Sequence, residues 1–77
     1  MPKLPRITSR KLLQVLSRAG FYIYHQTGSH ANLRHHTKTQ LHLVVPRHSG
    51  DLALKTLKSI IIQADMTVEE FVALLNQ

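Results

Sequence analysis

Residues 21–35 read FYIYHQTGSHANLRH, and this stretch decides the fold that the sequence predicts. Its opening residues are mostly aromatic or β-branched, which favours a strand over residues 21–26. Thr27-Gly28 is a turn signal, in which Gly28 is expected to supply a positive φ. A second strand is expected over residues 29–35, so the stretch predicts a β-hairpin.

The second strand of this hairpin alternates between apolar and polar side chains. Ala31 and Leu33 fall on one face, whereas His30, Asn32 and Arg34 fall on the other. Such alternation indicates a strand with one buried face and one open face.

The register of the first strand is less well defined by the sequence. A plain two-residue turn would pair His25 with His30 and direct Tyr22 and Tyr24 inward. The more apolar neighbours of these tyrosines would then face solvent. A β-bulge in the first strand is expected to correct this mismatch.

A third strand is expected after a polar connection. Residues 40–45 place Leu41, Leu43 and Val45 on one face, and Pro46 should end the strand because it lacks a backbone donor.

A helix is predicted before the hairpin, capped by Thr8 or Ser9 and running to Ala19. Gly20 follows as a left-handed terminator. The apolar stripe of this helix consists of Leu12, Leu13, Leu16 and Ala19.

Two more helices are predicted after a loop over residues 47–51. The stripe of the first consists of Leu54, Leu57, Ile60, Ile61 and Ala64. The second, over residues 68–75, begins at a capping box formed by Thr67 and Glu70, with Met66 and Phe71 placed as a hydrophobic staple. The expected fold is α+β, in the order α-β-β-β-α-α, with helices on one face of a three-stranded antiparallel sheet and a single domain over residues 1–77.

The charge of the chain is uneven. The net charge is +6, and residues 1–48 contain eight Lys and Arg but no acid. Such a basic half favours a polyanionic partner: nucleic acid, an acidic membrane face or an acidic protein. No apolar run is long enough to cross a membrane, so no membrane partner is expected. The absence of cysteine excludes disulfides and thiolate sites and fits a cytoplasmic setting.

Six histidines are the other unusual feature of the composition. A zinc site would need three or four converging ligands, often including cysteine or a carboxylate. The chain has no cysteine, and all its carboxylate side chains lie after residue 49. No metal site and no cofactor are therefore expected, and most of the histidines are expected on the surface.

His30 stands apart because it follows Gly28-Ser29 on the open face of a strand. A histidine can take or give a proton near neutral pH. RNA supplies its own nucleophile, the 2′-hydroxyl, so cleavage needs only a base, an acid and positive charge at the phosphate.

Several segments, in their order and spacing, resemble the HicA (YcfA-like) family of toxins from bacterial and archaeal toxin–antitoxin pairs. They are Leu12-Leu13, Leu16, Ala19-Gly20-Phe21, Gly28-Ser29-His30, Val45-Pro46-Arg47-His48 and the stretch from Lys55 to Phe71. The resemblance covers about Leu4 to Leu75. It implies a fold like a double-stranded-RNA-binding domain (dsRBD) and an mRNA interferase, an endoribonuclease that cuts messages and blocks translation.

The family's functional histidine maps onto His30, and a HicB-like antitoxin is expected to mask this site. Arg34, Lys38 and Asn32 are the candidate RNA contacts, and Gly28 and Ser29 are expected to shape the turn beside the site. Two positions depart from the family pattern: Lys55 replaces a usual glycine, and His25 replaces a usual arginine. The second departure implies a positive charge near the site that is either weaker or dependent on pH.

Three function classes remain open from the sequence. The first is a metal-independent ribonuclease toxin that uses His30. The second is a non-catalytic RNA-binding module with the same fold, and the third is a module whose basic face binds an acidic protein.

Overall fold

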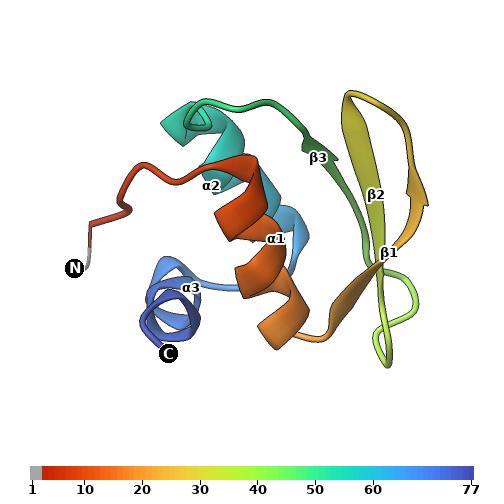
Figure 1. The fold of residues 1–77 in the computed structure, drawn as a ribbon. Helices are drawn as coiled ribbons and strands as arrows, with labels where there is room; N and C mark the ends of the chain where they lie inside the picture. The colour runs from red at the N-terminus through yellow and green to blue at the C-terminus, as the bar shows by residue number, and fades with distance from the viewer. Residues whose placement is uncertain (1–2) are drawn as a thin grey trace.

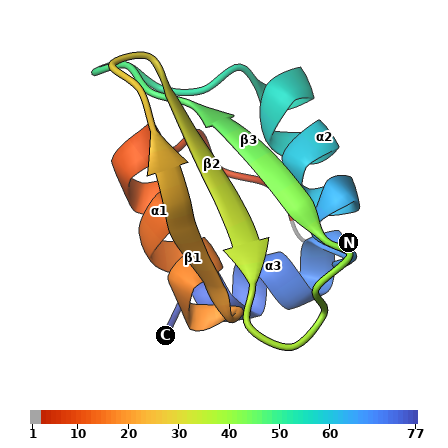
Figure 2. The same ribbon diagram turned by 90° about the vertical axis from the view of Figure 1, so that its right-hand side faces the viewer.

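Helices cover one face of a three-stranded antiparallel sheet in the computed structural model, which describes residues 3–77 (Figure 1). Figure 2 looks onto the opposite face of the sheet, which no helix of this part of the chain covers. The elements are α1 (Ser9–Arg18), β1 (Phe21–Gln26), β2 (His30–His35), β3 (His42–Pro46), α2 (Leu54–Gln63) and α3 (Val68–Leu75). The strand order is β1-β2-β3. The predicted α+β, dsRBD-like order is confirmed.

Helix α1 begins where the sequence predicts. The Thr8 side chain accepts a hydrogen bond from the Lys11 amide, which satisfies one of the free N–H groups of the first turn. Leu12 and Leu16 are fully buried, and so is Val15, which the predicted stripe omitted. The helix ends before Gly20, whose φ of +98° is the left-handed geometry expected there.

The β1–β2 hairpin differs from the simplest expectation in two ways. Gln26 pairs with Ala31, so the turn residues are Gly28 and Ser29 rather than Thr27 and Gly28. Gly28 is also not among the positive-φ residues of the described chain, which are Gly20 and Asp65. The Thr27 side chain, rather than a positive φ at Gly28, stabilises this turn, as described below for the site.

The expected β-bulge is confirmed between Ile23 and His25, where Tyr24 is the additional residue. The bulge keeps Phe21 in the core, at 4% exposure. Tyr22 pairs with Arg34 and is exposed, as is Tyr24. The bulge thus removes the inward orientation that a strand without the extra residue would have given the two tyrosines.

Strand β2 is central and has the predicted alternation. Ala31 and Leu33 are completely or almost completely buried. Leu43 and Val45 of β3 lie opposite them and are also buried. Strand β3 begins at His42, two residues later than expected, and includes Pro46.

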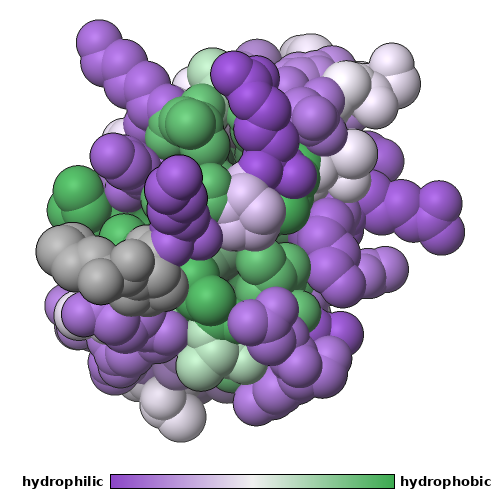
Figure 3. Space-filling model, turned by 90° about the vertical axis from the view of Figure 1, so that its left-hand side faces the viewer, coloured by the Kyte–Doolittle hydropathy of each residue, from purple (hydrophilic) through white to green (hydrophobic). Residues whose placement is uncertain are grey.

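Helices α2 and α3 complete the core from the other side. Leu57, Ile60 and Ile61 are buried, whereas Leu54, at the first position of α2, is exposed. The capping box of Thr67 and Glu70 is present, with both reciprocal hydrogen bonds. Figure 3 shows the helical side, where apolar side chains surface between hydrophilic ones.

The corner between α1 and β1 leaves no room for a side chain at position 20. A Cβ at Gly20 would lie 2.7 Å from Nε2 of His35, in addition to the strain of its positive φ. We expect Gly20→Ala to lower the free energy of unfolding by about 1–3 kcal/mol. Urea unfolding followed by circular dichroism measures this loss.

Gly28→Ala is the matched control, because a Cβ there meets no atom within 4 Å and its φ is not positive. It should unfold at the wild-type urea concentration. Equal stability of the two variants would contradict the account of the corner.

Candidate functional site

The β1–β2 turn holds the backbone of His30 through the Thr27 side chain. Oγ1 of Thr27 accepts from the His30 amide at 3.0 Å and donates to the His30 carbonyl at 3.3 Å. The Thr27 amide donates to the same carbonyl at 2.9 Å. The first residue of β2 is thus fixed on both sides of its Cα. The sequence pattern predicts Thr27 only as part of the turn and gives no signal for this role.

The His30 side chain projects from this turn and is exposed. Oγ of Ser29 lies 2.9 Å from Nδ1 of His30, within hydrogen-bond distance. Within residues 3–77, Nε2 of His30 makes no hydrogen bond. The imidazole is therefore oriented by its neighbour and presents its outer nitrogen to solvent.

Asn32 and Arg34 follow His30 on the same open face of β2. Because a strand rises ~3.3 Å per residue, they lie about 7 and 13 Å along the strand from His30. Asn32 is half-buried between His25 of β1 and Val44 of β3. The pairing places His25 diagonally across from His30 on this face.

Arg34 belongs to a cluster that spans all three strands: Tyr24, Arg34 and His42. The Arg34 guanidinium lies 4.6 Å from the centroid of the Tyr24 ring, a cation–π distance. The Tyr24 hydroxyl reaches His42 Nε2 at 3.1 Å. The ring thus supports the guanidinium from one side and leaves its N–H edges available to a ligand.

Lys38 does not join His30. It follows the opposite end of β2, where its ammonium lies 3.5 Å from Asp65 and its amide donates to Nδ1 of His35 at 2.9 Å. The structure therefore brings Asn32, Arg34 and His30 onto one face and leaves Lys38 at the far end of the sheet.

The open face carries no acidic side chain. All four acids lie after β3: Asp51 in the following loop, Asp65 between the last two helices, and Glu69 and Glu70 in the first turn of α3. The cations of β2 therefore have no competing carboxylate on the sheet. Among residues 3–77, no three His, Asp or Glu side chains come together as a metal ion would need.

Comparison of the sequence with known protein families gives a match. A family model described as the HicA toxin of bacterial toxin–antitoxin pairs matches residues 9–66. A search of curated proteins found no match. No helix in the described part of the chain has the length and apolarity to cross a membrane.

The role of Thr27 can be tested through the amide of His30. Thr27→Val keeps the shape of the side chain and removes the oxygen that accepts from this amide. We expect hydrogen exchange of the His30 amide to quicken about fivefold, the equivalent of a hydrogen bond of ~1 kcal/mol. NMR-detected exchange gives the rate.

Thr39→Val is the control, since Thr39 is exposed in the β2–β3 connection and far along the chain from the turn. It should leave the His30 amide unchanged. Unaltered protection of His30 in Thr27→Val would show that the side chain does not hold this turn.

Proposed function

This chain belongs to the HicA toxin family of bacterial toxin–antitoxin pairs, and from that premise we propose that it is an mRNA interferase, an endoribonuclease that cleaves RNA with His30 as its acid–base group. The observation that carries the proposal is the exposed His30 imidazole, held at the end of β2 on an acid-free face. It would act in the cytoplasm, on messages.

The reaction needs no group beyond the protein and the RNA. A base removes the proton of the 2′-hydroxyl, and the 2′-oxygen attacks the adjacent phosphorus. The bond from phosphorus to the 5′-oxygen breaks, and an acid donates a proton to that oxygen. The products are a 2′,3′-cyclic phosphate and a 5′-hydroxyl, and positive charge stabilises the phosphorane between them.

Ser29 suits His30 to this chemistry. A hydroxyl can both donate and accept, so Ser29 can hold Nδ1 in either protonation state. When Nδ1 carries the proton, Nε2 is free to act as the base. Ser29 is thus a positioning residue that supports the imidazole through the proton transfer.

Arg34 and Asn32 would bind the RNA on the same face. The guanidinium of Arg34 can donate two parallel hydrogen bonds to a phosphate while it stacks on Tyr24. At about 13 Å from His30 along the strand, it would bind a phosphate beyond the one that reacts. Lys38 would contact only an RNA long enough to cross the whole sheet.

Cleavage in excess EDTA tests the proposal. The wild-type protein should cut single-stranded RNA there, and His30→Ala should reduce the rate to background. The free energy of unfolding should change by less than about 0.5 kcal/mol, because His30 is exposed. Gel analysis of a labelled transcript measures the rate.

His36→Ala is the matched control, because His36 is also exposed but lies beyond the opposite end of β2. It should cut like the wild type. Cleavage by His30→Ala at the wild-type rate would refute the assignment, and RNA binding without cleavage by the wild type would favour the non-catalytic RNA-binding module.

A toxin of this kind has an antitoxin partner, and we propose that a HicB-like antitoxin covers the His30 face directly. A chain of net charge +6 is attracted to an acidic surface, and such attraction speeds association. Hydrogen exchange with and without the antitoxin should show protection of β2 and β3. Protection confined to α2 and α3 would show that inhibition acts from the helical side.

A further inference from the structure

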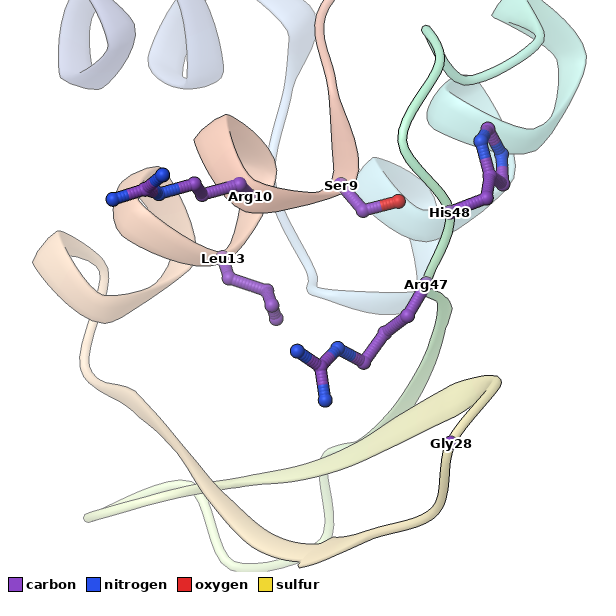
Figure 4. A pocket seen from close by; sticks show the side chains of 6 residues that line it. All are labelled: Ser9, Arg10, Leu13, Gly28, Arg47 and His48. Atoms are coloured by element: carbon purple, nitrogen blue, oxygen red, sulfur yellow. The ribbon is translucent and has the colours of Figure 1, made fainter.

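A hollow of about 560 Å³ lies on the helical side of the sheet, under the β1–β2 turn (Figure 4). It is bounded by the first turns of α1, by Gly28 and by the chain that leaves β3. Its lining residues are Ser9, Arg10, Leu13, Gly28, Arg47 and His48. In Figure 4, the Arg47 side chain extends into the space between α1 and the hairpin.

The charged groups that line this hollow are all basic. Within residues 3–77, the only side-chain ion pair joins Lys38 to Asp65, and neither Arg10 nor Arg47 uses its guanidinium in a hydrogen bond. The Ser9 hydroxyl is already committed, because it donates to the Pro46 carbonyl. The hollow therefore offers free N–H donors and positive charge, which an anion would satisfy.

The hollow and His30 lie on opposite sides of the same turn. The Arg47 amide donates to the Ser29 carbonyl at 2.8 Å, which extends the β2–β3 ladder by one step. His30 and Pro46 pair with each other one step further along the ladder. Since side chains alternate along a strand, His30 and Pro46 lie on the open face, whereas Arg47 faces the helices. The backbone hydrogen bond between Arg47 and Ser29 therefore connects the residues that precede His30 to the edge of the hollow.

The turn is open at Gly28, where an RNA strand could pass. A Cβ added at Gly28 would meet no atom within 4 Å, so the space on this side of the turn is open. An arginine can bind a phosphate with two parallel hydrogen bonds, and Leu13 offers an apolar surface at the base of the hollow.

We propose that this hollow is a subsite for a phosphate next to the one that reacts at His30, and that the RNA passes over the Gly28–Ser29 turn to reach it. The inference rests on the proposed ribonuclease function and adds a second phosphate-binding site to it. A base-paired helix is too stiff to contact both faces of the sheet around a two-residue turn. The substrate is therefore single-stranded RNA.

Binding to the full-length His30→Ala protein tests this subsite without cleavage. The probes are a fluorescent single-stranded RNA and a self-complementary duplex of similar composition, each titrated at several salt concentrations. The slope of log K against log salt is negative, and adding Arg47→Ala should reduce its magnitude by about 0.7 for the single strand. That corresponds to about a fivefold loss of affinity at 0.1 M salt relative to a 1 M reference. Affinity for the duplex should not change.

Lys58→Ala is the matched control, because it removes the same charge from an exposed position of α2. Arg47→Gln repeats the test with a side chain closer in size to arginine, should Arg47→Ala fold poorly. If Lys58→Ala and the Arg47 variants lost equal RNA affinity, the subsite would be overturned. If the Arg47 variants lost equal affinity for the duplex and for the single strand, the inference that the substrate is single-stranded would be overturned.

The same measurements separate this inference from the proposed function. Cleavage by the wild type together with no effect of the Arg47 variants on RNA affinity would retain the nuclease and reject the hollow. If the Arg47 variants weakened only antitoxin binding, the hollow would be a protein-binding site, and the inference would also be wrong.

Discussion

Ala31 and Leu33 are buried between the sheet and the helices, and their burial sets the orientation of every other side chain on β2. Because side chains alternate along a strand, His30, Asn32 and Arg34 must then face away from the core. A slip of one residue would bury the cations and expose the apolar pair. Pairing with β1 on one edge and β3 on the other opposes such a slip. The whole candidate site is in this sense a consequence of the register of a single central strand.

Hydrogen bonds from side chains to the backbone connect both ends of α1 to the sheet. At its start, the Ser9 hydroxyl donates to the Pro46 carbonyl at 2.6 Å. At its end, Nε2 of His35 lies 2.9 Å from the Ala19 carbonyl, while the ring packs edge-on against Phe21. A chain of this size has a small core, so such links contribute to its order. The link at Ser9 also holds α1 beside the loop that carries Arg47. The hollow lies where α1 and this loop meet.

The open face of the sheet carries cations but no acids, whereas the rest of the molecule carries both signs of charge. The cations proposed to bind RNA lie on the open sheet face and around the hairpin turn, whereas the acids follow β3 in the sequence and lie in the α2–α3 region or the loop before it. A polyanionic substrate and an acidic inhibitor would then be attracted to the same surface. Competition of this kind would allow an antitoxin to block a nuclease without altering its fold.

The sequence alone determined the helices, the central strand and the position of His30, because each rests on local chemistry. Caps, a left-handed glycine and two-residue alternation act within a few neighbouring residues. The sequence also predicted a bulge in the first strand, but the tertiary structure decided its position at Tyr24, which depends on how β1 meets β2. It also decided the separation of Lys38 from His30 and the approach of Arg47 to the turn. These relations join residues distant in the chain, and only packing of the sheet against the helices brings such residues together or keeps them apart.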